Sequence, residues 1–431
     1  MTPEIMKRID QIRNGEIPEG YKKGKIGIVP EEWEEVPFST LFTSTSDYTD
    51  DLEKYPLYSL TIEDGITAKT ERYDRSHLVK KENSYKIVCP NDYAYNPMNL
   101  RFGAVARHRG SFPVAVSGYY DIFTTVHKSD LPFMDSFLTS GFMITYYNRM
   151  STGSLVEKQR VHFSDFLKFS LPLPPIEERK RIADILTTQD AIIECCEKKI
   201  NQLKQMKKYY LQNIFPKHGE TVPKIRFKGF NGPWEQCRLG EMVVFSKGTG
   251  YSKGDLKKIG TPIILYGRLY TDYEPVIEKV DTFVDMKPGS VFSNGGEIII
   301  PASGESAEEI SIASVVKESG IILGGDINII TPPVNLDSVF LAISLSEGKP
   351  HYDLAKMAQG KSVVHLHNND LEKIELIYPS YAEQVQISTF IMSIDKLITL
   401  HKKKLKEEQK KKVALQQQLF MGIVRIKNER I

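Results

Sequence analysis

The sequence predicts a mixed α+β fold with a pseudo-twofold internal repeat, in which two β-rich α/β domains are separated by two long antiparallel helices. The first observation is a self-match without gaps between residues 171–215 and 376–420. The second is that the two tryptophans, Trp33 and Trp234, stand at equivalent points before the two domains, where we interpret them as anchors of the first strand. The third is that short aromatic and β-branched segments fill the roughly 135 residues that follow each tryptophan. A repeat this long fixes the architecture as two large halves.

The repeated stretch carries helix signals in both copies. Prolines stand at its start, where a helix tolerates them, and carboxylates follow. Thr188 and Ser393 precede further carboxylates, which is typical of a helix N-cap. We therefore expect a short helix over about 176–187, a break, and a long helix to about 215, with the same plan in the second copy. The aligned identities include Glu178/Glu383, Asp190/Asp395, Lys207/Lys412 and Phe215/Phe420.

The apolar residues of the two long helices follow the three-and-four spacing of a helical seam. Two equivalent helices would pack antiparallel with their middles together, which predicts an ion pair between Lys207 and Glu408. Packing of each stripe against its own domain is the alternative. A helix of about 27 residues is roughly 40 Å long, close to the roughly 34–36 Å of one turn of B-DNA. The predicted seam residues are Ile193, Ile200, Leu203, Lys207, Ile398, Leu405, Glu408 and Leu415.

The repeat divides the chain into five parts. The interiors of the two β-rich domains align poorly outside their edges, which suggests one task performed on different targets. Segments 134–150 and 336–345 are expected to be helices late in each domain. The five parts are an N-terminal helix and linker (1–23), a first β-rich domain (24–170), a central helical connector (171–222), a second β-rich domain (223–375) and a C-terminal helical connector (376–431).

The totals describe an ordinary globular protein without a strong overall charge. The chain has 431 residues, a formal net charge of +2, 41% hydrophobic residues and 26% charged residues. Binding to a nucleic acid would therefore need positive charge that is clustered on one part of the surface. The lysine runs 198–208 and 402–412 are candidates, although such runs are more often solvated helix faces. The four cysteines show no CxxC spacing. No signal peptide and no run of about 18 apolar residues is present. We expect a cytoplasmic protein with reduced thiols and no membrane segment.

Catalytic and metal-binding motifs are incomplete in this chain. Segment 96–99, Asn-Pro-Met-Asn, lacks the second proline and the aromatic residue of the adenine-methyltransferase motif. The stretch ending at Gly360-Lys361-Ser362 lacks the first glycine of a P-loop. His365 and His367 share a strand face without a third ligand at suitable spacing. We expect no catalytic residue and no metal site.

With both halves described, the chain resembles the specificity (DNA-recognition) subunit of type I restriction–modification systems. The resemblance covers nearly the whole chain. Its motifs are VPEEW (29–33) and PKIRFKGFNGPWE (223–235), the connectors LPLPPIEERKRIADIL (171–186) and YPSYAEQVQISTFI (378–391), and the long-helix sequences KKINQLKQMKKYYLQNIF (198–215) and KKKLKEEQKKKVALQQQLF (402–420).

The resemblance implies a non-catalytic subunit of an adenine DNA methyltransferase and endonuclease. Each β-rich domain would be a target-recognition domain that reads one half of a bipartite double-stranded DNA sequence. The helices would set the spacing and dock two methylation subunits, with two restriction subunits added in a restricting complex. S-adenosylmethionine, ATP and Mg would be bound by the partner subunits and not by this chain.

Candidate DNA contacts are side chains that read base edges, together with glycines and hydroxyls that let backbone approach phosphates. In the first domain they are Arg101, Arg107, His108, Arg109, Lys158, Gln159 and Arg160; in the second they are Lys247, Tyr251, Ser252, Lys253, Arg268, Tyr270, Lys361, Ser362 and His365.

Two other functions remain as alternatives. A coiled-coil scaffold that presents two protein-binding domains would not show salt-sensitive binding to duplex DNA, because that dependence comes from neutralising phosphates. An endonuclease acting alone would need a metal–carboxylate cluster, and none is evident in the sequence.

Overall fold

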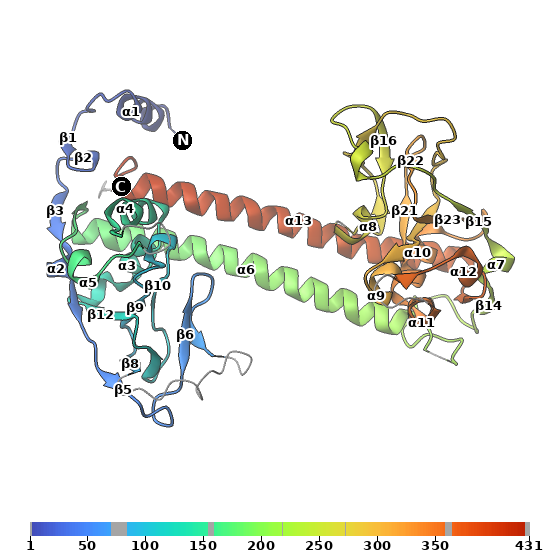
Figure 1. Ribbon diagram of the computed structural model, residues 1–431, viewed down its shortest axis with the longest axis horizontal. Coiled ribbons are helices and arrows are strands. Elements are labelled where there is room, and N and C mark those ends of the chain that lie inside the picture. Colours follow the sequence, from blue (N-terminus) through green and yellow to red (C-terminus); the bar gives the residue numbers. More distant parts are fainter. Residues whose placement is uncertain are drawn as a thin grey trace. The chain divides into compact units, whose positions relative to one another are not determined.

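Two helices are by far the longest elements (Figure 1): α6 spans Ile176–Ile214, 39 residues, and α13 spans Tyr381–Phe420, 40 residues. The computed structural model describes residues 2–69, 84–153, 159–217, 219–271, 273–357 and 364–426. The chain forms two compact units, unit 1 (Met1–Glu197 with Lys403–Ile431) and unit 2 (Lys198–Lys402), so each long helix contributes to both. Among the described helices, none has the length and apolarity needed to cross a membrane.

Both long helices are continuous, so the predicted break near residue 188 is wrong. Thr188 Oγ1 donates to the carbonyl oxygen of Asp184 at 2.7 Å, and Ser393 Oγ donates to that of Phe390 at 2.6 Å. The two hydroxyls bond back to the preceding turn of their own helix and do not cap a new one.

Each unit contains the same two-stranded frame. In unit 1, β3 (Glu34–Pro37) pairs antiparallel with β13 (Ser170–Leu173); in unit 2, β14 (Glu235–Arg238) pairs antiparallel with β25 (Glu375–Tyr378). A single-turn helix follows the first strand in both, α2 (Phe38–Leu41) and α7 (Leu239–Met242). Trp33 and Trp234 directly precede these strands and are both buried, in agreement with their predicted role as anchors.

The central sheets share one strand order although their sequences diverge. Unit 1 has the order β10 (Val105–Arg107), β9 (Tyr93–Tyr95), β12 (Asp121–Thr125), β4 (Phe42–Ser44). Unit 2 has the order β15 (Val244–Lys247), β23 (Ile327–Thr331), β19 (Ile298–Pro301), β21 (Ser314–Val316), β17 (Val276–Ile277). Read from the strand that follows the frame, β4, β12, β9 and β10 correspond to β15, β23, β19 and β21, and these neighbours are antiparallel in both units. In unit 2, β17 is an additional edge strand parallel to β21.

Strand register supports this correspondence at the level of single residues. Phe123 of β12 lies opposite Tyr93 of β9, and Ile330 of β23 lies opposite Ile298 of β19. The repeat therefore extends into the interiors, where sequence comparison did not detect it. Paired strands constrain backbone geometry and the alternation of buried positions but not side-chain identity.

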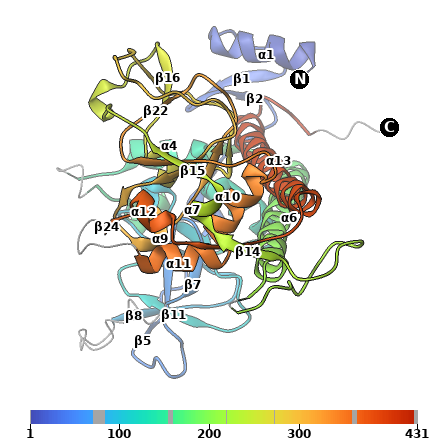
Figure 2. The same ribbon diagram turned by 90° about the vertical axis from the view of Figure 1, so that its right-hand side faces the viewer.

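Further strands and helices complete each unit. The predicted helix over 134–150 is present as two helices, α3 (Leu131–Leu138) and α4 (Gly141–Met150), and the predicted helix over 336–345 is confirmed as α10 (Ser338–Glu347). In unit 2 a further helix that the sequence did not predict, α11 (Lys349–Met357), follows, and the view of Figure 2 shows α10 and α11 on the near side. The other elements of unit 1 are α1 (Pro3–Arg13), β1 (Tyr21–Gly24), β2 (Gly27–Pro30), β5 (Tyr48–Thr49), β6 (Tyr58–Thr61), β7 (Gly65–Ala68), β8 (Tyr85–Val88), η3 (Leu100–Phe102), β11 (Val114–Ser117), η4 (Lys128–Asp130) and α5 (Phe163–Phe166). Those of unit 2 are η6 (Lys253–Asp255), β16 (Thr261–Ile264), α8 (Arg268–Thr271), β18 (Phe283–Val284), β20 (Ser303–Gly304), α9 (Ala307–Ile310), β22 (Ile322–Leu323), β24 (Val364–His365) and α12 (Asn368–Leu371).

Within each unit the parts of α6 and α13 run antiparallel, and an ion pair joins them. In unit 1, Lys412 Nζ lies 2.5 Å from Asp190 Oδ1; in unit 2, Lys207 Nζ lies 2.8 Å from Asp395 Oδ1. These four residues are mates in the sequence repeat, so the two ion pairs are equivalent. The antiparallel helices and the internal repeat are thus confirmed.

The register of the seam differs from the prediction. Lys207 does not pair with Glu408, whose carboxylate accepts a hydrogen bond from Gln189 Nε2 at 2.7 Å. In the observed register Asp190 and Asp395 instead pair with Lys412 and Lys207. Of the other predicted seam residues, Leu203 and Ile398 share one buried cluster and Ile200 is buried, while Ile193, Leu405 and Leu415 are partly exposed.

Candidate nucleic-acid interface

The turn after β10 in unit 1 presents an exposed arginine on a fixed backbone. His108 is only 2% exposed; its N–H donates to the carbonyl oxygen of Asp92 at 2.7 Å, and its Nε2 lies 2.8 Å from the carbonyl oxygen of Phe112. A Cβ at Gly110 would lie 2.6 Å from Cε1 of this buried ring, so the turn requires glycine there. Arg109 stands between them with 73% of its side chain exposed. Buried groups therefore set the direction in which Arg109 leaves the domain.

Asp135 of α3 binds both arginines of this turn. Arg107 donates to its carboxylate through Nε at 2.9 Å and Nη2 at 2.7 Å, Arg109 donates through Nη2 at 3.0 Å, and the Tyr93 hydroxyl donates at 2.7 Å. The hydrogen bonds that Arg107 donates to Asp135 raise the pKa of the Arg107 guanidinium. Arg107 Nη1 donates to Asn91 Oδ1 at 2.6 Å, so all three of its nitrogens are engaged within the protein. Arg107 therefore has a structural role, whereas the part of the Arg109 guanidinium that does not contact Asp135 faces solvent.

A cleft of about 420 Å³ lies beside the turn. Its walls come from the β6–β7 hairpin, β10, the 108–112 turn, α3 and the α6–α13 helix pair of unit 1. Three cationic side chains face three carboxylates in its lining, so the cleft offers donors and acceptors without an excess of positive charge. These six are Arg107, Arg109, Lys412, Asp64, Asp135 and Asp190.

Unit 2 has a counterpart to this turn. Strand register places Arg107 of β10 and Val315 of β21 at corresponding positions, because each lies opposite the equivalent residue of the neighbouring strand. Arg109 and Lys317 each follow by two residues. Both corresponding positions therefore carry a cation at the exit from the sheet, and both side chains are more than half exposed, at 73% and 54%.

The groups around Lys317 come from other elements than those around Arg109. Its Nζ lies 2.8 Å from Glu278 Oε1, which follows the additional strand β17, and this hydrogen bond raises the pKa of the lysine. The buried Ser293 fixes the turn: its Oγ donates to the carbonyl oxygen of Glu318 at 2.8 Å and accepts from the Ile321 N–H at 3.1 Å. Each unit thus pairs its cation with a carboxylate and holds its turn with a buried polar side chain; the carboxylate is mostly buried in unit 1 and exposed in unit 2.

The remaining candidates of the first domain lie near the η3 helix. Arg101 Nη1 donates to Gln159 Oε1 at 3.0 Å, and the guanidinium lies over the Phe102 ring at 4.6 Å from its centroid. Arg160 forms an isolated antiparallel bridge with Thr152. Lys158 lies outside the described residues. The cleft described above does not include this group, so the structure divides the predicted contacts of unit 1 into two places.

In unit 2 the glycine-rich loop that contains Tyr251 is hydrogen-bonded to the segment around Ser290. The Tyr251 hydroxyl accepts from the Lys287 N–H at 2.7 Å and lies 2.5 Å from Ser290 Oγ. Ser252 caps η6 together with Asp255. Lys247 and Lys253 are exposed at the two ends of the loop.

Arg268 is engaged within unit 2. Its Nη1 donates to Asp281 at 3.1 Å, and its Nη2 donates to Glu274 at 3.2 Å and to the carbonyl oxygen of Lys279 at 2.9 Å. With 16% of its side chain exposed, Arg268 closes the segment that follows α8.

The last candidates surround β20 and β24. The Tyr270 hydroxyl donates to the carbonyl oxygen of Ser303. His365 is exposed, with its ring parallel to that of His367 at 6.2 Å between centroids. Lys361 and Ser362 lie outside the described residues. Within the described part of the chain no three His, Cys, Asp or Glu side chains come together as metal ligands.

Sequence reasoning missed Asp135, Glu278 and Lys317. Lys317 follows a buried strand as Arg109 does, but only strand register makes the two correspond. Asp135 and Glu278 lie 26 and 39 residues from the cations that they bind, so no local spacing indicates the pairs.

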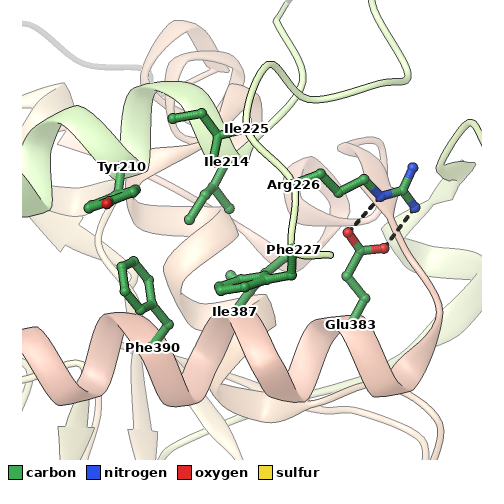
Figure 3. Close-up of a pocket in the computed structure, with 8 residues that line it drawn as sticks. All are labelled: Tyr210, Ile214, Ile225, Arg226, Phe227, Glu383, Ile387 and Phe390. Atoms are coloured by element: carbon green, nitrogen blue, oxygen red, sulfur yellow. Dashed lines mark hydrogen bonds and ion pairs between the residues drawn. The ribbon is translucent and has the colours of Figure 1, made fainter. Parts of the chain in front are cut away.

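The junction of helix and domain is closed by a buried ion pair in each unit. Unit 2 has a cavity of about 120 Å³ at this junction. Figure 3 shows its lining residues, with the guanidinium of Arg226 against the carboxylate of Glu383. Arg226 donates from Nε and Nη2 at 2.8 Å each; in unit 1, Arg425 donates in the same way to Glu178 at 2.8 and 2.9 Å. The cavity is lined mainly by apolar and aromatic side chains and is well below the roughly 300 Å³ at which ligand pockets begin. Its role is structural.

Fold and site together define a protein with two related but unlike domains, each of which presents an anchored cation, on a pair of antiparallel helices. The chain belongs to the family described as type I restriction modification DNA specificity domain, which matches residues 30–205 and again 231–410.

Relatives agree with this membership over nearly the full length. The chain is 23% identical to a protein of Methanocaldococcus jannaschii described as the putative type I restriction enzyme MjaX specificity subunit, over 95% of this chain and 97% of that protein. It is also 23% identical to the MjaVIII specificity subunit of the same organism, over 93% and 95%. The solved S subunit of a type I restriction-modification system from M. genitalium has the same fold, with a TM-score of 0.55 at 14% identity, over 90% of this chain and 96% of that one.

Proposed function

We propose that this chain is the DNA sequence-specificity subunit of a type I restriction–modification complex, in which unit 1 reads one half of a bipartite target and unit 2 reads the other. The observation that carries the proposal is the double match to the specificity-domain family, once in each half of the chain. The shared sheet order supports equivalent tasks for the two units. The divergent side chains on that frame support two unlike half-sites.

The proposal gives the chain a binding role and leaves catalysis to its partners. The antiparallel helices would fix the number of unread base pairs and dock two methylation subunits, with two restriction subunits in the restricting form. S-adenosylmethionine, ATP and Mg would be bound by those subunits. The methylation partner would take an adenine out of the stack to reach its reacting atom.

Salt-dependent binding to duplex DNA tests this function against the scaffold alternative. The full chain with its methylation partner is titrated into labelled duplexes at several salt concentrations, with a heteropolymeric RNA hairpin as competitor control. A specificity subunit should lose affinity by roughly a thousandfold or more between 50 and 200 mM salt, because bound phosphates release counterions. Binding that is absent, or independent of salt, would support the scaffold.

A further inference from the structure

We infer that Arg109 and Lys317 are corresponding base-reading residues, each of which contacts the O6/N7 edge of a guanine in its own half-site. The inference rests on the proposed function and names the residue through which each unit selects a base. It starts from strand register, which makes Arg107 and Val315 correspond, so that each cation lies two residues past an equivalent position of the shared sheet. At most of the other corresponding positions of these sheets the two units carry different residues. An exposed cation at this position in both units therefore indicates a common use.

The hydrogen bond that holds Arg109 favours a contact with a base edge over a mobile contact with a phosphate. Its Nη2 donates to Asp135 at 3.0 Å, and Asp135 is itself fixed by Arg107 and Tyr93. A long exposed side chain normally loses rotamer freedom on binding, and anchoring it beforehand removes part of that loss. The four N–H donors not engaged by Asp135 include a pair that fits guanine O6 and N7.

The charge of the cleft also favours base reading. Three cations are matched by three carboxylates in its lining. A site built to neutralise phosphates would carry an excess of positive charge. Here the neighbouring carboxylates orient the N–H donors of the arginines. The cleft therefore offers hydrogen-bond donors in fixed directions and not a net positive charge. Asp135 is in this account a positioning residue that acts through Arg109.

Lys317 also pairs with a carboxylate and follows an anchored turn, but this pair is open to solvent, with the Lys317 and Glu278 side chains 54% and 64% exposed. Glu278 takes the place of Asp135 at 2.8 Å, and Ser293 fixes the turn where unit 1 uses His108. The shared frame does not require either carboxylate, since one comes from a helix and the other follows an edge strand with no counterpart in the described part of unit 1. Each support therefore serves the cation that it holds.

The test is genome-wide methylation mapping in cells that carry the full chain and its methylation partner. R109A should relax one base position of the first half-site and leave the second unchanged, and K317A should do the reverse. A bidentate contact discriminates by roughly tenfold to a hundredfold, so methylation at sites with the wrong base at that position should rise by about that factor relative to sites with guanine. D135N should relax the same position as R109A, whereas a purely structural role would lower methylation at all sites together.

Controls separate the possible failures. R149A changes another exposed arginine of unit 1, on α4, and should leave both half-sites intact. Methylation that falls equally at all sites in R109A, with an unchanged motif, and that R109K restores by keeping the charge would assign a phosphate contact and overturn the inference. An unchanged motif in R109A and K317A would also overturn it. A wild-type complex that methylates no split motif would instead refute the proposed function.

Discussion

Replacing Glu383 by Gln should destabilise unit 2 strongly. The Glu383 carboxylate is 1% exposed, and both of its oxygens accept hydrogen bonds from Arg226, whose side chain is 15% exposed. The amide keeps the shape but cannot match both guanidinium donors, and it leaves the arginine charge buried without a counterion. Removing one partner of a buried ion pair costs about 3–5 kcal/mol. That is a large share of the roughly 5–15 kcal/mol that stabilises a typical domain.

Urea unfolding followed by tryptophan fluorescence measures the effect in one unit at a time. Trp33 and Trp234 are the two tryptophans of the chain, so a W33F background leaves Trp234 as the probe of unit 2. With an m-value of about 3 kcal/mol per M, the E383Q midpoint should fall by about 1 M or more. E372Q, at an exposed glutamate of the same unit, is the matched control and should leave the midpoint in place.

A double substitution separates the ion pair from simple packing. When both charged partners become apolar residues of similar volume, no charge remains buried, and the change is often neutral. R226M/E383L should therefore recover most of the stability lost in E383Q. A midpoint equal to wild type in E383Q, or a double variant less stable than E383Q, would refute the reasoning.

Three further predictions concern the helices and their flanks. Leu203→Ala removes a side chain packed on Ile398 and should cost unit 2 about 2–5 kcal/mol in urea unfolding; a loss well below 1 kcal/mol would contradict the observed seam. Burial raises the pKa of Glu178, but the hydrogen bonds and the charge of Arg425 outweigh burial and bring the pKa below the usual 4.5. The ionised Glu178 therefore stabilises unit 1 above about pH 4.5, and this stabilisation is lost as the pH falls through the lowered pKa. The acid-induced fall in stability should shrink in Glu178→Gln, and equal pH profiles would speak against it. Desolvation of its carboxyl raises the pKa of Glu347, although the side chain keeps contact with solvent. Glu347→Gln should therefore raise the urea midpoint of unit 2 slightly at about pH 7 and lose this advantage toward about pH 4.5, and a lower midpoint at neutral pH would show a stabilising role instead.

The sequence predicted the parts of the fold that are signalled by the residue types of a local segment. The helical repeat, the tryptophan anchors and the late helices could be read from residues, because caps, periodicity and a matched pair of rare residues leave local signals. The seam register could not, because Asp190 and Asp395 looked like helix-start carboxylates, and their partners Lys412 and Lys207 lie far away in sequence.

The candidate site shows the same limit. Arg109 was predicted because arginine in a glycine-containing turn is typical of DNA contacts. Its neighbours Arg107 and His108 were predicted on the same grounds, yet both are engaged inside the domain. Which of three adjacent polar residues faces outward depends on the turn backbone and on Asp135, a residue of another element. Lys317 could be recognised only after the strands had been paired.

The central claim is that the two units read two unlike halves of one DNA target. The most direct measurement is single-molecule sequencing of methylated adenines in a host without other methyltransferases, with the chain and its methylation partner supplied together. The account predicts one split motif, with two different half-sites separated by a fixed number of unread bases, and no methylation when the chain is omitted. A continuous motif, or methylation that persists without the chain, would contradict it.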